Sequence, residues 1–226
     1  MAQPEPEPRL TRLVLIRHGQ SRATVDQIAG GELGCTGLTE LGVRQVEALR
    51  DRVSDTAELA GATALLASTL PRAVETAEIL APALGGLTVV THRDLSELQP
   101  GEGDGLTWGE WGARFGGFRM ADEPYRPLAP GGESWAEFQL RVGRTLSALI
   151  VAEAGGLVVI ACHGGIIEGS IRNFLGLGWL SGTEALETPA NSSLTEWTCA
   201  VQPTGALSWR LVRYNDAAHL ASVMPS

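Results

Sequence analysis

The sequence of 226 residues contains no lysine, and all 17 of its basic residues are arginines. Without a lysine amine, the chain can form neither a Schiff base nor a lysine-containing phosphate-binding loop. Cysteine is nearly absent as well. Cys35, Cys162 and Cys199 are an odd number of thiols without the spacing of a metal site, so they predict reduced cysteines in a cytoplasmic protein.

Long hydrophobic runs are also missing, and no stretch is both long and apolar enough to cross a membrane. Residues 1–8 lack the basic and apolar segments of a secretory signal, and residues 1–10 are predicted to be a flexible tail rich in proline and glutamate. The formal net charge of −9 argues against a nucleic-acid partner, because the chain would repel a polyphosphate backbone.

Apolar side chains are plentiful and make up 44% of the sequence, which is typical of a folded globular protein. A chain of this length is expected to form one domain with a sizeable core, residues 11–226. Aromatic residues make up only 5% of the chain, but several of them cluster with arginines at about 96–131. This less regular stretch is predicted to be an insertion that forms a lid.

Two histidines occupy matching settings far apart in the sequence. Residues 13–16 form a short apolar run that leads to His18, and residues 157–162 form another that leads to His163. Each run is too short for a buried helix and predicts a buried strand, and each histidine is followed by glycine, which lets a ligand come close. Ligands of a parallel sheet bind at the carboxyl ends of its strands, so both histidines are expected in one crevice.

Two further apolar runs repeat this arrangement. Residues 62–67 end shortly before Arg72, and residues 87–91 end shortly before Glu97. If all four runs are parallel strands, Arg72 and Glu97 join the two histidines and Arg17 at one edge of the sheet. Two guanidinium groups suit an oxyanion with several equivalent oxygens, because each can donate in a bidentate fork. The sequence therefore predicts a phosphate site with a nucleophile and a proton donor.

The remaining patterns complete an alternation of strands and helices. The segments predicted to be helices are 39–58, a helix that opens at Pro71, 133–153 and 164–175. Two strands at 193–201 and 206–214, separated by a Pro-Thr-Gly turn, predict a hairpin near the end of the chain.

The sequence around His18 resembles the Arg-His-Gly signature of the histidine phosphatase superfamily, which includes the phosphoglycerate mutases. Further segments resemble motifs of this family in the same order: residues 38–42, 68–76, 95–107, 130–134, 163–165 and 191–193. The resemblance implies a phosphoglycerate mutase-like fold of the α/β class, which is a three-layer α/β/α sandwich with a mostly parallel central sheet.

The resemblance also implies a role for each matching residue. His18 would be the catalytic nucleophile that becomes a phosphohistidine, and Glu97 would protonate the leaving oxygen. The substrate-binding residues would be Arg17, Thr24, Arg72, His163 and Gly164, of which the two arginines and His163 also count as catalytic.

Some assignments stay open. Gln20 replaces an acidic residue that is frequent in the family, and Thr24 replaces a phosphate-binding asparagine. Glu102 and Asp104 compete with Glu97 as the acid. A metal site is disfavoured because no two histidines are spaced three or four residues apart and no carboxylate lies beside either histidine.

The expected activity is hydrolysis of a small phosphomonoester through a phosphohistidine, without metal or organic cofactor. The alternatives are a phosphoglycerate mutase, or a catalytically weak relative that binds a phospho-ligand or a protein. The expected partner is a small phosphorylated molecule, not a nucleic acid or a membrane, and a homodimer is left open.

Overall fold

A computed structural model describes residues 10–120, 122–177, 187–202 and 204–223. Nearly all of the predicted tail therefore lies outside the described residues. A single six-stranded sheet forms the centre of the molecule, with strand order β3-β2-β4-β1-β5-β6. The strands are β1 (Leu10–Arg17), β2 (Ala64–Ala67), β3 (Val89–Thr91), β4 (Leu157–Cys162), β5 (Leu194–Val201) and β6 (Leu207–Asp216).

The sheet is mostly parallel, as predicted. Strands β3, β2, β4 and β1 are joined by three parallel pairings, so the four apolar runs identified in the sequence run in one direction. Strand β5 pairs antiparallel with β1, and β6 pairs antiparallel with β5, which confirms the predicted hairpin. The carboxyl ends of β1, β2 and β4 consequently meet at one edge of the sheet.

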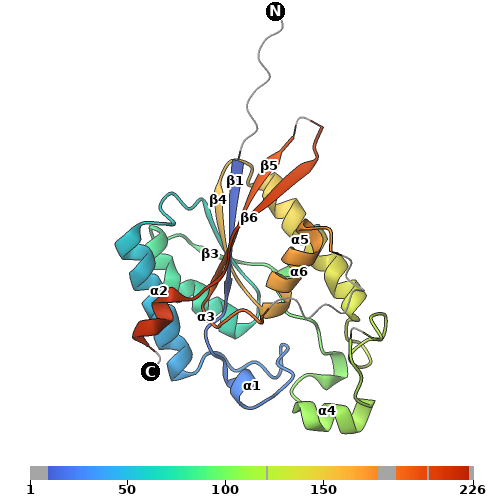
Figure 1. The fold of residues 1–226 in the computed structure, drawn as a ribbon. Coiled ribbons are helices and arrows are strands. Elements are labelled where there is room, and N and C mark those ends of the chain that lie inside the picture. Colours follow the sequence, from blue (N-terminus) through green and yellow to red (C-terminus); the bar gives the residue numbers. More distant parts are fainter. Residues whose placement is uncertain (1–9, 121, 178–186, 203, 224–226) are drawn as a thin grey trace, which may run out of the picture.

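Helices cover both faces of this sheet (Figure 1). The helices are α1 (Arg22–Val25), α2 (Glu40–Thr56), α3 (Pro71–Leu80), α4 (Trp108–Phe115), α5 (Trp135–Ala152) and α6 (Gly164–Phe174). Leu13 and Leu15 of β1 belong to the core that α5 and α6 close, whereas Val14 and Ile16 belong to the core beneath α2 and α3. The three-layer α/β/α sandwich is therefore confirmed, and the continuous apolar run of β1 arises because both of its faces are buried.

Side-chain caps form the starts of two of the predicted helices, α2 and α5. The Thr39 hydroxyl accepts a hydrogen bond from the main-chain N–H of Gly42 at the start of α2. Ser134 and Glu137 form a reciprocal capping box at the start of α5. Pro71 is the first residue of α3, where its missing N–H costs no hydrogen bond.

The stretch at about 96–131 is irregular except for short 3-10 turns and α4. In Figure 1 this stretch and α1 lie beyond the carboxyl ends of the central strands. Within the described ranges, no helix is both long enough and apolar enough to cross a membrane.

Candidate active site

His18 lies at the end of β1, and its hydrogen bonds define the state of its ring. Its main-chain N–H donates to the carbonyl of Cys162 on β4 at 2.9 Å. Its Nδ1 lies 2.7 Å from the carbonyl oxygen of Gly19, which can only accept, so Nδ1 carries the hydrogen. Its Nε2 accepts a hydrogen bond from Nε of Arg72 at 3.1 Å. The lone pair of the imidazole is therefore on Nε2.

Burial lowers the pKa of His18 well below its usual value, and the charges of Arg72 and Arg17 lower it further, against the opposing effect of the Gly19 hydrogen bond. The side chain is only 4% exposed. The imidazole is consequently neutral at neutral pH, which is the form whose Nε2 has an unprotonated lone pair that can attack phosphorus.

His163 lies against the ring of His18, with ring centroids 5.2 Å apart in an edge-to-face arrangement. It is fully buried, and neither of its ring nitrogens has a hydrogen-bond partner among the described residues. Burial, together with the charges of Arg72 and Arg17 and the neighbouring His18, lowers its pKa well below the usual value. The structure thus brings together the two histidines that the sequence placed at separate strand ends.

This pair of buried histidines predicts how stability depends on pH. Above the ordinary histidine pKa, the rings are neutral in both the folded and the unfolded chain. As the pH falls through about 6.5, the unfolded chain binds protons that the folded chain does not, so the free energy of unfolding falls. Each ring should contribute a loss of about 1.4 kcal/mol between pH 7.5 and 5.5.

Urea unfolding at both pH values checks this expectation. His163→Gln should reduce the pH-dependent loss by about 1.4 kcal/mol. His92→Gln, in a loop outside the site, controls for the replacement of a histidine. An unchanged pH-dependent loss in the His163 variant would contradict a neutral, buried His163.

The two arginines come from different elements and converge on the histidines. Arg72 lies in the first turn of α3 and is 6% exposed, and one of its terminal nitrogens donates to the carbonyl of Gly30 at 2.8 Å. Arg17 ends β1 and donates to the carbonyl of Pro189. Burial is the main cause that lowers the pKa of Arg17, and Glu97 opposes it. Two partly desolvated cations next to each other favour binding of a multiply charged oxyanion.

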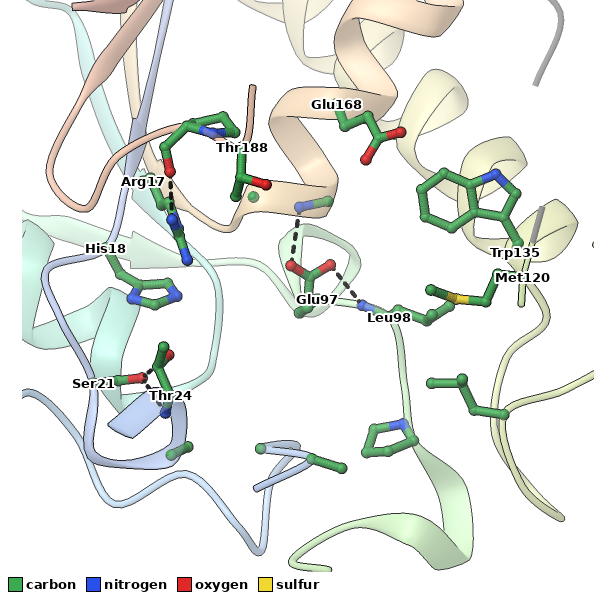
Figure 2. Close-up of a pocket in the computed structure, with 18 of the residues that line it drawn as sticks. Arg17, His18, Ser21, Thr24, Glu97, Leu98, Met120, Trp135, Glu168 and Thr188 are labelled. Carbon is green, nitrogen blue, oxygen red and sulfur yellow. Dashed lines mark hydrogen bonds between the residues drawn. The ribbon is translucent and has the colours of Figure 1, made fainter. Parts of the chain in front are cut away.

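Glu97 is held by main-chain groups rather than by an arginine. Its two carboxylate oxygens accept hydrogen bonds from the N–H groups of Leu98 and Gly165, each at 3.0 Å. Because Gly165 belongs to the first turn of α6, this contact ties the loop of Glu97 to the strand end that carries His163. Figure 2 shows the carboxylate between Arg17 and His18 on one side and Trp135 and Met120 on the other.

The two competing carboxylates lie elsewhere. Asp104 accepts hydrogen bonds from the main-chain N–H groups of Gly31, Leu33 and Gly34 at 2.8–2.9 Å, so it anchors that loop. Glu102 is exposed and pairs with Arg114 at the surface. Of the three acids considered from the sequence, only Glu97 lines the main cavity.

A cavity of about 1060 Å³ is lined by His18, Glu97 and the two arginines, whereas the fully buried His163 does not line it. Thr24 and Gly164, to which the resemblance assigns substrate binding, also line the cavity. The Thr24 hydroxyl shares a hydrogen bond with the Ser21 hydroxyl at 2.9 Å. The Gln20 side chain does not line the cavity: it accepts a hydrogen bond from the Thr39 hydroxyl at 2.8 Å and so contributes to the start of α2.

Several residues at the site were not predicted individually, among them Trp135, Glu168 and Asn191. Trp135 on α5 and Glu168 on α6 line the far side of the cavity, where Glu168 pairs with Arg172 at 2.9 Å. Asn191 donates from its amide to the carbonyl oxygen of His18 at 3.0 Å. The motif at 191–193 was the only sequence signal for Asn191. Trp135 and Glu168 gave no signal, because the direction of their side chains depends on how α5 and α6 pack.

The other histidines lie outside the cavity. His219 is buried and shares a hydrogen bond of 2.8 Å with the Ser192 hydroxyl, and burial lowers its pKa to about 4. His92 accepts a hydrogen bond from the main chain of Asp94. In the part of the chain that the structure describes, no group of three histidine, cysteine or acidic side chains could hold a metal ion.

Comparison with known proteins identifies relatives of this chain. Glucosyl-3-phosphoglycerate phosphatase of Mycobacterium tuberculosis is 31% identical over 226 aligned residues, covering 95% of this chain and 98% of that protein. A solved structure of mycobacterial glucosyl-3-phosphoglycerate phosphatase in complex with VO3 matches with a TM-score of 0.73 and 31% identity, over 91% of this chain and 99% of that one.

A bifunctional protein of Mycobacterium tuberculosis is 36% identical over 156 residues, which cover 68% of this chain. The chain spans only 41% of the length of that relative. The sequence profile of the histidine phosphatase superfamily (branch 1) matches residues 13–217, a segment that contains every residue of the site described above. The chain therefore belongs to branch 1 of the histidine phosphatase superfamily.

Proposed function

We propose that the protein is a phosphatase that hydrolyses a small phosphomonoester through a phosphohistidine on His18. The observation that carries this proposal is the Nε2 lone pair of His18. The hydrogen bond from Nδ1 to the carbonyl of Gly19 leaves the lone pair on Nε2, Nε of Arg72 donates to it, and the His163 ring packs against the imidazole. The likeness to a phosphatase solved with the oxyanion VO3 supports the same chemistry.

In the first step, Nε2 of His18 attacks phosphorus and forms the P–N bond, while the bond between phosphorus and the leaving oxygen breaks. Arg17, Arg72 and His163 donate to the equatorial oxygens, where stabilisation of the transferred group is most effective. Glu97, protonated before this step, gives its proton to the leaving oxygen. The products are a free alcohol, a phosphohistidine and the Glu97 carboxylate.

In the second step, the Glu97 carboxylate takes a proton from water, and the water oxygen attacks the phosphohistidine. The P–N bond breaks, inorganic phosphate forms and His18 returns to its neutral state. Glu97 is again protonated, so the cycle needs no other proton carrier.

Two alternatives make different predictions. A phosphoglycerate mutase would return the phosphoryl group to a second hydroxyl, and the absence of any lysine together with the aromatic lid favours a phosphatase over it. A relative that only binds would show no turnover. Four of the five predicted catalytic side chains line one cavity, and the fifth, His163, packs against the ring of His18, which favours an active enzyme.

Release of inorganic phosphate from 4-nitrophenyl phosphate, with and without added bisphosphoglycerate, separates the three functions. A phosphatase releases phosphate at the same rate in both cases. A mutase needs the bisphosphate and transfers the group to phosphoglycerate, and a binding protein releases none. His18→Ala, prepared in parallel, shows whether a contaminating phosphatase is responsible.

Activity is expected to be independent of metal ions. Arg17, Arg72 and His163 stabilise the negative charge of the phosphoryl group, so no divalent cation is required for this. Excess chelator should leave kcat/KM within about twofold of the untreated value, a change too small to reflect a lost metal ion. A loss of activity that an added divalent ion restores would contradict this proposal.

We further propose that the stretch at about 96–131 is a lid that selects the leaving group. Trp108 lines the cavity and is half exposed, whereas Trp111 is buried and donates to the carbonyl of Leu128 at 2.9 Å. Of these two tryptophans, only Trp108 is therefore placed to contact a substrate. The sequence did not distinguish these two tryptophans.

Trp108→Ala should change the ratio of kcat/KM between bulky and small phosphomonoesters by about tenfold, as the loss of one aromatic contact would. Trp111→Ala is the matched control: it should lower stability by about 3 kcal/mol but leave that ratio unchanged. Equal losses for all substrates in the Trp108 variant would mean that Trp108 serves only packing.

A cytoplasmic location is proposed as well, supported by the three cysteines, which are all buried free thiols. The homodimer left open by the sequence is decided by the molar mass in solution. A value near 23.8 kDa would exclude it, and twice this value would establish it.

A further inference from the structure

Arg141 is a buried cation outside the lining of the phosphate-site cavity. It lies on α5, is 8% exposed and does not line the cavity. Its Nε and one terminal nitrogen donate to the two carboxylate oxygens of Glu133 at 2.7 and 2.6 Å, which is a bidentate pair. Glu133 belongs to the motif at 130–134, for which the proposed chemistry gives no role.

The other donors of Arg141 reach the main chain of the loop that carries Glu97. One terminal nitrogen donates to the carbonyls of Asp94 and Ser96 at 2.7 and 2.9 Å, and the other also donates to the carbonyl of Glu97 at 3.3 Å. All five guanidinium hydrogens thus have an acceptor. Three of the five acceptors are carbonyls at or just before the proposed acid.

Glu133 holds the same loop on the other side of Glu97. Its carboxylate accepts the N–H of Gln99 at 3.0 Å, and its own N–H donates to the carbonyl of Gln99 at 2.9 Å. Residues 94, 96, 97 and 99 are therefore fixed by one ion pair. The Glu97 side chain itself has only two main-chain donors, so its position depends on where this loop lies.

We propose that Arg141 and Glu133 form a positioning pair that sets the Glu97 carboxyl group at the leaving oxygen. The pair does not touch substrate, and the inference rests on the proposed function of Glu97 as proton donor. A displacement of a catalytic group by about 1 Å can reduce the rate by about 100-fold, so a small shift of this loop is enough to remove acid catalysis.

A purely structural ion pair would behave differently. If the pair only stabilised the fold, its loss would reduce the rate equally for every substrate or reduce only the folded fraction. If it positions the acid, its loss matters most when the leaving group needs a proton. An alkoxide leaving group needs the proton fully, whereas a nitrophenolate scarcely needs it.

The test compares kcat/KM for a simple alkyl phosphate and for 4-nitrophenyl phosphate, because kcat/KM reports the steps up to the phosphohistidine. Arg141→Lys keeps the charge but cannot bond to Glu133 and the three carbonyls at once. The double variant Glu133→Gln, Arg141→Met removes both charges, so no unpaired charge stays buried if the single variant unfolds. Arg144→Lys, at an exposed position of the same helix, is the matched control.

We expect Arg141→Lys and the double variant to lose about 100-fold on the alkyl phosphate and less than about fivefold on 4-nitrophenyl phosphate, whereas Arg144→Lys changes neither. In a Glu97→Gln background, the same replacements should cause no further selective loss on the alkyl phosphate, because the proton donor is already gone.

Equal losses on both substrates, an unchanged ratio in the folded double variant, or a selective loss that persists in the Glu97→Gln background would each overturn the positioning role. These outcomes are distinct from failure of the proposed function. If the proposed function were wrong, the unmodified protein itself would not hydrolyse 4-nitrophenyl phosphate.

Discussion

His18→Ala is expected to lower kcat/KM by at least about 10⁴-fold, because it removes the atom that bonds to phosphorus. The other histidine of the site is not expected to replace it. His163 is neutral and buried, but its ring lies edge-on to His18 rather than at the end of β1. The variant should still bind inorganic phosphate, since Arg17 and Arg72 remain, and binding by calorimetry would show that the site is intact.

The same hypothesis predicts a covalent intermediate in the unmodified protein. Brief incubation with substrate and a quench that avoids acid should give one acid-labile phosphoryl group per chain, mapped to His18. His92→Ala should retain this label, and His18→Ala should lose it. A phosphoryl group mapped to Ser21 or Ser68 would contradict the assignment.

The centre of the sheet could be predicted because β1 and β4 are buried on both faces. Continuous apolar runs such as 13–16 and 157–162 have few other interpretations when glycine follows them, and parallel strands have a common direction. The helix starts at Thr39 and Pro71 could be predicted because capping depends on local residue types. The position of β5 and β6 beside β1 could not, since strand order depends on contacts between distant segments.

The residues of the site likewise fall into those that the sequence could predict and those that it could not. Residues at strand ends, such as His18 and His163, could be predicted because the topology of the sheet alone brings them together. Arg141 and Trp135 could not, because α5 presents different faces to the loop and the cavity, and only the packed structure shows which side chain points where. The same limit explains why Trp108 and Trp111 looked alike in the sequence.

The second large effect is expected from Glu97→Gln. The glutamine cannot give up a proton, so kcat/KM for an alkyl phosphate should fall by about 10³-fold, within the usual range of general acid catalysis. For 4-nitrophenyl phosphate the fall should be less than about tenfold, because nitrophenolate leaves without protonation. The intermediate should then persist, since the variant also lacks the base that activates water.

A burst of about one nitrophenolate per site, followed by slow turnover, would report this accumulation. The comparison between substrates matters because glutamine offers only one acceptor, whereas both oxygens of Glu97 accept a main-chain N–H. A general disturbance of the site should lower both rates equally, whereas the lost proton should lower only the alkyl rate further. Glu102→Gln, at the exposed surface, is the matched control and should leave both rates unchanged. Equal losses on the two substrates would show that Glu97 is not the acid, and Asp104 would then have to leave its three main-chain donors to act in its place.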